Sequence, residues 1–446
     1  MSKIKLKKII LLVILFSLIF IYSMAIKPIS ADEIWEYGFG YNISKGLVPY
    51  RDFNMIVTPF YPFCLALFIK IFGHYLLSAH IFNTILLIIT ISLMFKMIGN
   101  KSMIIVPILM YSLYNILPTY NSLIFFLTIL LIYIKQQTIN KQNNSLLSGL
   151  IISIMVLTKQ SIGIVFFILE LILTKNKRQY LLTFLIPIII LLIYLKINNA
   201  LYSFIDYCVL GILDFAETNS KISYFFIVFI IMVTFLVILY KKYKNKDILY
   251  GLAFMSMCVP LFDYSHTLIS FVIFLFTILK NIKYKESLTK YICIYLYLFF
   301  ILIISCEPIV IYNQNNYLKG RNIGNIEYAK VIENTSYILD QKYDKYDKVY
   351  IFLGPMSNAI KMYRNEPINK YDNINNGNIG YNGDKKYIKE IDNYCNKNKC
   401  LFLLKSYDFN KEQVNKKIID YIKNNYKYIE QDKYNYFYDY IKYYSN

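Results

Sequence analysis

The chain has 446 residues, of which 57% are hydrophobic and 17% are charged, and its mean hydropathy is +0.42. This composition is typical of a polytopic membrane protein and excludes an ordinary soluble one. The formal net charge of +20 would suggest nucleic-acid binding in a soluble chain. Here the lysines and arginines lie largely in short loops between apolar runs and in a polar tail. Membrane topology therefore accounts for much of the charge, and no nucleic-acid partner is expected.

The first apolar run extends from Ile9 to about Ile26 and follows the basic start MSKIKLKK. The positive-inside rule predicts a cytoplasmic amino end and an external far end for this run. A cleaved signal peptide is the alternative, but the sequence ISA before Asp32 is a poor cleavage site and the apolar core is long for a signal. We therefore favour an uncleaved anchor, which places the adjacent carboxylates Asp32 and Glu33 outside.

Later apolar runs predict further spans, several of them near the lower length limit for crossing a bilayer. They cover about 76–96, 102–117, 121–135, 146–158, 160–175, 180–196, 222–240, 247–262, 265–280 and 288–306. The run at 57–73 decides the topology. If this run lies on the outer surface as a juxtamembrane helix, the basic loops at 135–142, 175–178, 241–246 and 280–286 all fall inside. We therefore predict about eleven spans, with the amino end inside and the carboxyl end outside.

This topology collects a set of ionisable residues on the external side. They are Asp32, Glu33, Arg51, Asp52, His80, Lys159, Asp206, Asp214, Glu217, Asp263 and His266. The cytoplasmic loops carry mainly Lys, Asn and Gln, and the sequence contains neither GxGxxG after a strand nor GxxxxGK[ST]. Any reaction site is therefore expected outside, where an activated substrate would have to arrive through the membrane.

The opening third of the chain resembles a known superfamily. A first transmembrane run, an immediate Asp-Glu, then GLVPYRDFN followed by TPFYPF resemble the polyprenyl-phosphate-sugar-dependent glycosyltransferases of the GT-C superfamily. The resemblance is closest to the bacterial branch with protein O-mannosyltransferase-like and aminoarabinose-transferase-like enzymes. A second shared feature is GLIISIMVLTKQSIG at 149–163, a helix pair with Lys159 at its outer turn. His80 stands near a position at which many relatives carry an arginine.

The resemblance implies transfer of a sugar, with inversion, from a polyprenyl-phosphate carrier to an external cell-envelope acceptor that is a glycan, a lipid or a protein. Such a transfer needs a base for the acceptor hydroxyl and positive charge for the departing phosphate. Asp32 matches the catalytic acidic position of the superfamily and is the candidate general base. The predicted catalytic residues are Asp32 and Glu33, and the predicted substrate and phosphate contacts are Arg51, Asp52, His80, Lys159 and His266.

Some members of the superfamily use a divalent metal ion, so the resemblance leaves a metal open here, and no cofactor is assigned. Oxygen and nitrogen ligands that could hold such an ion are Asp32, Asp206, Asp214, Asp263 and His266.

Each of these residues also has a purely structural interpretation. An Asp-Glu pair at the exit of a span can be a solvated flank, and Lys159 can be a snorkelling lysine in a hairpin turn. Arg51 and Asp52 can form a local ion pair that holds the loop. Glu170 lies inside a span, which would normally indicate function, but it shortly precedes the basic KNKR, so local pairing is the favoured interpretation.

The composition changes to Tyr, Asn, Lys and Asp from about Glu307 onward. We therefore divide the chain into a transmembrane glycosyltransferase-like domain at 1–306, with external loops at 27–75 and 197–221, and an extracytoplasmic soluble domain at 307–446. The amphipathic loop at 197–221 could lie on the outer membrane surface and cover the lipid donor.

Strands and helices alternate in the carboxyl-terminal domain, which favours an α/β fold. Buried strands are predicted at 347–354 and 399–406, helices at 325–341, 385–395 and 410–426, and a late strand in YNYFYDYIKYY. Cys395 and Cys400 fall at a helix-to-strand turn on the oxidising side, where they either form a disulfide or remain thiols.

Two classes of function remain. One is a multi-pass plasma-membrane glycosyltransferase that uses a lipid-linked sugar donor. The other is a non-catalytic or transport protein of envelope polysaccharide export, such as a flippase or a polymerase-associated subunit. A transporter places ionisable residues midway through several spans, whereas this chain concentrates them at one external rim. The pattern therefore favours the enzyme.

Overall fold

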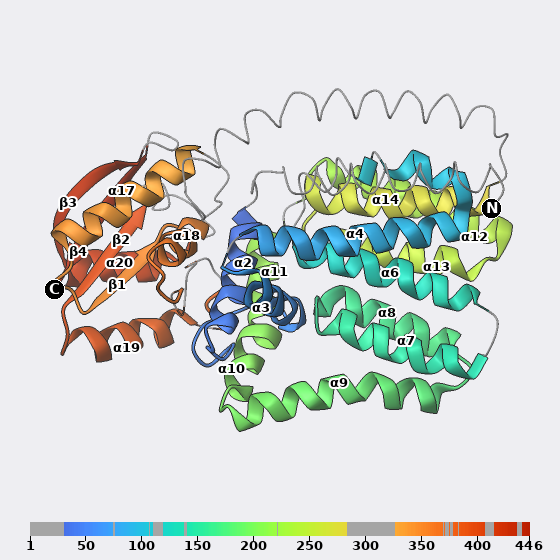
Figure 1. Ribbon diagram of the computed structural model, residues 1–446, viewed down its shortest axis with the longest axis horizontal. Helices are drawn as coiled ribbons and strands as arrows, with labels where there is room; N and C mark the ends of the chain where they lie inside the picture. The colour runs from blue at the N-terminus through green and yellow to red at the C-terminus, as the bar shows by residue number, and fades with distance from the viewer. Residues whose placement is uncertain are drawn as a thin grey trace. The chain divides into compact units, whose positions relative to one another are not determined.

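The computed structural model is mostly helical and carries one small β-sheet (Figure 1). It describes residues 31–74, 76–106, 108–109, 119–137, 141–220, 222–282, 326–368, 370, 374, 378–381, 383–405, 414–434 and 439–446. The predicted spans at 9–26 and 288–306 lie outside these residues. The described residues form two compact units. We call 76–190 with 222–282 the helix unit, and 31–74 with 191–220 and 326–446 the α/β unit.

The helix unit is built from apolar helices that lie side by side (Figure 1). They are α4 (Leu76–Ile98), α6 (Tyr120–Gln136), α7 (Lys141–Val156), α8 (Gln160–Leu173), α9 (Lys177–Ile197, shared with the α/β unit), α12 (Phe225–Tyr243), α13 (Lys246–Phe254) and α14 (Tyr264–Asn281), with 3₁₀ turns η1 (Gly99–Lys101) and η3 (Met255–Cys258). By length and composition, four stretches of the described residues can cross a membrane: Ser78–Val106, Lys177–Ile197, Phe225–Tyr243 and Tyr264–Asn281.

Most of the spans predicted from the sequence coincide with one of these helices. The span expected at 247–262 is broken, because α13 ends at Phe254 and the 3₁₀ turn η3 follows, shortly before Pro260. Proline lacks a backbone N–H and disfavours helical backbone at the residue before it, and Val259 is accordingly extended. The span expected at 102–117 is described only in part. The total of about eleven spans and the orientation of the ends stay predictions.

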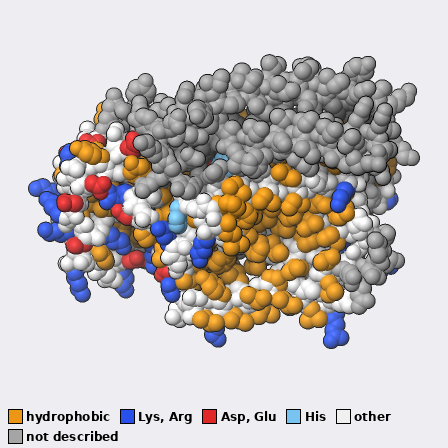
Figure 2. Space-filling view, in the orientation of Figure 1, with side chains coloured by type: hydrophobic (Ala, Val, Ile, Leu, Met, Phe, Trp, Pro, Cys, Tyr) orange, Lys and Arg blue, Asp and Glu red, His pale blue; other side chains and the backbone are white. Residues whose placement is uncertain are grey.

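One face of the helix unit is covered by exposed apolar side chains (Figure 2). On α8, Ile164, Ile168 and Ile172 repeat every four residues and are 50%, 52% and 71% exposed. Large aliphatic residues of α9 and α12 are exposed in the same way. Because such a surface is costly in water and suits hydrocarbon, it agrees with a position in lipid.

Glu170 is fully buried and is held by residues from other helices. It forms an ion pair with Lys135 of α6, and Tyr250 of α13 donates its hydroxyl to Glu170 Oε2 at 2.6 Å. Ser148 of α7 lies 3.4 Å from Glu170 Oε1. Glu170 is therefore paired, but the expectation of local pairing beside KNKR is wrong, because its partner Lys135 lies on α6.

The α/β unit combines amino-terminal helices, a central helical segment and a carboxyl-terminal sheet. The first two groups are α2 (Ala31–Ser44), α3 (Phe60–Phe72), α10 (Leu201–Phe204), the π-helix η2 (Ile205–Leu210) and α11 (Gly211–Asn219). The third comprises α17 (Ile326–Lys342), β1 (Lys348–Phe352), α18 (Pro355–Tyr363), α19 (Gly383–Cys395), β2 (Cys400–Lys405), α20 (Lys416–Asn425), β3 (Lys427–Tyr434) and β4 (Asp439–Ser445).

The four strands form one mixed sheet in the order β1-β2-β4-β3. β1 and β2 are parallel, with Ile351 opposite Leu403, and β4 is antiparallel to both β2 and β3. Alternate residues of β1 and β2 point to opposite faces. Ile351 and Leu403 belong to a core shared with α17 and α18, whereas Tyr350 stacks on Phe402 at 5.0 Å on the other face. Both faces of the parallel pair are therefore buried.

The predicted strands at 347–354 and 399–406 correspond to β1 and β2, and the three predicted helices correspond to α17, α19 and α20. The late strand predicted in YNYFYDYIKYY corresponds to β4, whereas the sequence interpretation missed α18 and β3. The predicted juxtamembrane run at 57–73 contains the helix α3, while its position on the outer surface stays a prediction. So does the domain division at residue 306, since 307–325 are not described.

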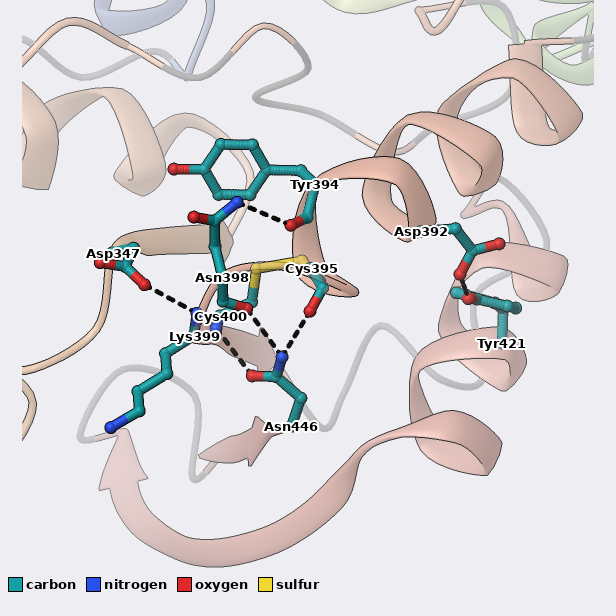
Figure 3. The surroundings of a disulfide bond; sticks show 9 residues. All are labelled: Asp347, Asp392, Tyr394, Cys395, Asn398, Lys399, Cys400, Tyr421 and Asn446. Carbon is teal, nitrogen blue, oxygen red and sulfur yellow. Dashed lines mark hydrogen bonds between the residues drawn. A yellow bond between two sulfur atoms is a disulfide. The ribbon is translucent and has the colours of Figure 1, made fainter.

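Cys395 and Cys400 form a disulfide that joins the end of α19 to the start of β2 (Figure 3). The side chain of Asn446, which follows β4, reinforces this turn. Its Nδ2 donates to the carbonyl oxygens of Cys395 at 2.6 Å and Asn398 at 2.8 Å, and its Oδ1 accepts the Cys400 N–H at 2.8 Å. The disulfide and the end of β4 therefore stabilise the same corner of the sheet.

Removal of this disulfide should lower stability by about 2 kcal/mol, because the cross-link closes a short loop of chain. We expect Cys395→Ser/Cys400→Ser in purified protein to have a lower melting temperature than the oxidised wild type and to be insensitive to reductant. Cys64→Ser, which alters a free thiol on α3, should keep the wild-type response to reductant. Equal melting temperatures for oxidised wild type and double variant would contradict the prediction.

Candidate functional site

Asp32 and Glu33 lie in the first turn of α2, where the positive end of the helix dipole favours carboxylates. Adjacent residues of a helix point about 100° apart, and here Asp32 is exposed whereas Glu33 is fully buried. The two predicted catalytic carboxylates are therefore not equivalent. Of the two, only Asp32 is exposed.

The helix that carries Asp32 is anchored in the core of the carboxyl-terminal sheet. Ile34 belongs to the same buried cluster as Ile332, Ile351 and Leu401. Further along α2, Gly38 packs against Asn358 of α18 so closely that an added Cβ would lie 2.7 Å from Asn358 Nδ2. A side chain at Gly38 would push α18 away or reorient Asn358, so glycine permits this helix contact.

Hydrogen bonds from the segment after α18 extend this anchoring. Asn42 of α2 accepts the Ile368 N–H at 3.0 Å. Asn54, in the loop after α2, donates its N–H to the Lys370 carbonyl at 2.7 Å and its side-chain amide to the Asn378 carbonyl. Residues more than three hundred positions apart in the sequence therefore determine the position of α2 and of the loop that follows it.

Arg51 and Asp52 form a two-point ion pair at the tip of this loop. Arg51 Nε and Nη2 each lie 2.8 Å from an Asp52 oxygen. Asp52 Oδ2 also accepts the Val48 N–H at 2.7 Å. The hydrogen bonds from Arg51 hold the pKa of Asp52 below its usual range. The local ion pair offered as the structural alternative is present. Since the Arg51 side chain remains 45% exposed, its other N–H donors can still bind an anion.

Asp206 of η2 is engaged by the carboxyl-terminal residues. Its carboxylate pairs with Lys386 of α19 at 2.7 Å, and its carbonyl accepts the Tyr381 N–H at 3.4 Å. Gly380, with a φ of 84°, lies against Tyr207, where an added Cβ would be 2.4 Å from a ring carbon. Asp206 therefore joins the segment 201–219 to α19. Asp214 and Glu217 follow on α11.

Lys159 lies in the turn between α7 and α8, as the sequence predicts, while the outer side of that turn stays a prediction. Its Nζ lies 3.4 Å from Asn121 Oδ1, 3.3 Å from Met257 Sδ and 5.0 Å from the centre of the Tyr120 ring. Tyr120 and Asn121 are the first residues of α6. The amino ends of α6 and α8 therefore meet at Lys159, and both helix dipoles add positive potential there.

Asp263 and His266 begin α14 near the same lysine. Asp263 caps the helix by accepting the His266 N–H at 2.8 Å, and His266 Nδ1 lies 2.8 Å from Asp263 Oδ2. Burial would raise the pKa of Asp263, but hydrogen bonds from His266 and the charges of His266 and Lys159 lower it. His80 is buried in the first turns of α4, and its carbonyl accepts the Thr84 hydroxyl at 2.7 Å.

The predicted residues fall in both units. Asp263, His266 and Lys159 lie close together in the helix unit, which also contains His80. In the α/β unit, Asp32 and Glu33 lie at the amino end of α2, whereas Arg51 and Asp52 lie in the loop after its carboxyl end. Within the described ranges, no three His, Cys, Asp or Glu side chains come close enough to hold a metal ion. The sequence interpretation missed Asn54, Asn358 and Lys386 because nothing in a local pattern reveals a partner so distant along the chain.

No protein-family model and no curated protein matches this sequence. Among solved structures, the chain is similar to ArnT from Cupriavidus metallidurans bound to undecaprenyl phosphate, with a TM-score of 0.61 and 8% identity over 98% of each chain. The chain has the GT-C fold. The resemblance inferred from GLVPYRDFN and TPFYPF is thereby confirmed at the level of fold. Together with the apolar helices, the GT-C fold identifies a helical membrane protein.

The Asp206–Lys386 pair offers a test of how the GT-C fold is held together. Lys386→Glu should lower the free energy of unfolding by about 2 kcal/mol, because it places two like charges together at a site where Asp206 is only 10% exposed. The charge-swapped Asp206→Lys/Lys386→Glu should recover most of the loss in a melting experiment. Lys342→Glu, at the more exposed pair with Glu430, should change stability by less than about 0.5 kcal/mol. A swap no more stable than the single variants would contradict the prediction.

Proposed function

We propose that the protein is an inverting glycosyltransferase that moves a sugar from a polyprenyl-phosphate carrier to an acceptor hydroxyl of the cell envelope. The observation that carries the proposal is the full-length similarity to ArnT, whose structure holds undecaprenyl phosphate. The exposure of Asp32 and Arg51, and the place of Lys159 at the amino ends of α6 and α8, support it. The acceptor belongs to one of three classes: a glycan, a lipid or a protein.

Asp32 acts as the general base in this proposal. As the acceptor oxygen attacks the anomeric carbon, its proton passes to the Asp32 carboxylate, and the bond from that carbon to the phosphate oxygen breaks. Attack from the face opposite the leaving group inverts the configuration. The exposure of Asp32 at the start of α2 supports this role. Glu33, the next residue, is buried. This burial supports a role for Glu33 in the structure and charge of the first turn of α2.

The departing polyprenyl phosphate carries the negative charge that develops in the reaction, so cations and helix amino ends must stabilise it. Lys159, where α6 and α8 begin, supplies a point charge, and Arg51 supplies a planar set of donors. His266 beside Asp263 and His80 in α4 extend the proposed phosphate contacts. Asp52 orients Arg51 through their two-point hydrogen bond.

The reaction takes place on the outer side of the plasma membrane in this proposal, with the carboxyl-terminal residues also outside. The Cys395–Cys400 disulfide supports this placement, because disulfides persist in oxidising compartments and are rare in the cytosol. A lipid-linked donor needs no cytoplasmic nucleotide site, in agreement with the missing nucleotide motifs in the sequence.

The decisive experiment measures transfer of radiolabelled sugar from a panel of undecaprenyl-phosphate-linked donors to envelope extract, using membranes at matched expression. Asp32→Asn should lower the rate at least about 100-fold, because the amide cannot accept the proton. Lys159→Met should raise the donor KM. The anomeric configuration of the product should be opposite to that of the donor.

Asp344→Asn is the matched control, because Asp344 is exposed in the turn after α17 and should keep wild-type activity. Full activity in Asp32→Asn would remove Asp32 from the mechanism. Retention of the donor configuration would overturn the inverting reaction. Absence of transfer by the wild type from every donor would contradict the proposal and favour a protein of polysaccharide transport.

A further inference from the structure

Tyr50 has a backbone conformation that bulky side chains rarely adopt. Its φ is 68°, in the left-handed region that glycine usually fills. Gly46, four residues earlier, has a φ of 88° and pays no such steric cost. A non-glycine residue remains in this region only when its surroundings hold it there, and such residues concentrate at functional sites. Tyr50 directly precedes Arg51 in the loop between α2 and α3.

Contacts of the Tyr50 side chain stabilise this backbone conformation. It is fully buried, and its hydroxyl donates to the Val57 carbonyl at 2.7 Å. The same hydroxyl faces the Cys208 thiol of η2, and the ring packs edge-on against Phe204 of α10 at 5.1 Å. Tyr50 therefore anchors the loop to the segment 201–210.

A second anchor follows Arg51 and Asp52. Phe53 is also fully buried and stacks on Phe39 of α2 at 5.9 Å. Its carbonyl accepts the Tyr50 N–H at 2.8 Å, which closes a tight turn. The half-exposed Arg51 and its partner Asp52 thus project from a turn whose two ends are fixed, one on η2 and one on α2.

We propose that Tyr50 is a positioning residue for Arg51. The left-handed backbone at Tyr50, held by its buried hydroxyl and ring, directs the Arg51 guanidinium toward the phosphate of the lipid-linked donor. This inference rests on the proposed function. It adds a residue that acts through Arg51 and touches neither sugar nor phosphate.

The test compares Tyr50→Phe and Tyr50→Val with the wild type in two measurements on the purified full-length protein. The first is the rate at which phenylglyoxal modifies Arg51, mapped by mass spectrometry with Arg178 of α9 as the internal reference. The second is the Kd for undecaprenyl phosphate, which requires no knowledge of the sugar. Tyr337→Phe is the control, because Tyr337 lies on α17 and is 66% exposed.

Tyr50→Phe should weaken undecaprenyl phosphate binding about fivefold, since it removes a buried hydrogen bond. Tyr50→Val should weaken it more, because a β-branched residue resists positive φ. Arg51 should be modified faster in both variants, while Tyr337→Phe should match the wild type. In an Arg51→Ala background, Tyr50→Phe should have no further effect on Kd, because a residue that acts through another is not additive with it.

Unchanged Arg51 reactivity in Tyr50→Phe would overturn the inference, whatever the wild type binds. Additive effects of Tyr50→Phe and Arg51→Ala on Kd would overturn it too, because they would show that Tyr50 acts through the fold in general. If Arg51 reactivity changes but the wild type does not bind undecaprenyl phosphate, the proposed donor is wrong. In that case the lipid phosphate is not the ligand of Arg51 either. These outcomes separate failure of the inference from failure of the proposed function.

Discussion

The burial of Ile34 in the core of the carboxyl-terminal sheet is the contact on which the candidate catalytic region depends. This one side chain of α2 packs with residues of α17, β1 and β2. A fully buried aliphatic side chain contributes about 2 kcal/mol, and the close approach of Gly38 to Asn358 extends the contact by another turn of α2. Asp32 lies two residues before Ile34, so its position is set by the sheet.

Polar contacts also hold α2 and its neighbouring segments in place. Asn42 and Asn54 bind backbone groups of residues 368–378, and Lys386 binds Asp206. Two of these contacts satisfy oxygens that are buried and costly to leave without a partner, those of Asn42 and Asp206. The carboxyl-terminal residues therefore form a frame for the amino-terminal loop and the segment 201–219. The sequence had predicted that these carboxyl-terminal residues form a separate soluble domain.

The sequence predicted the elements whose pattern is local. β1 and β2 were recognisable because a strand buried on both faces is a continuous apolar run. β3, with the sequence KYIEQDKY, was missed because a charged edge strand lacks that pattern. α18 was missed because it is short and begins at Pro355. The broken span after Phe254 was overlooked because hydropathy does not register what Pro260 does to the backbone.

Only part of the candidate site could be predicted from the sequence. The GLVPYRDFN motif identified the fold and the Arg51–Asp52 pair, because both are encoded within a few residues. It could not indicate that Glu33 is buried while Asp32 is exposed, since that depends on which face of α2 meets the sheet. Nor could it pair Asp206 with Lys386, 180 residues away. No periodicity specifies such a partner.

The candidate residues differ in the contacts that protonation or ligand binding would break. Asp206 is tied to Lys386 and Asp263 to His266, and each pair fixes the start or the course of a helix. Chemistry at either carboxylate would weaken a contact that holds the fold. Arg51 is different, because its pairing with Asp52 uses only part of its donor set and its side chain remains accessible. A cation of this kind, on a turn anchored at both ends, can receive and release an anion without rearrangement of the chain that carries it.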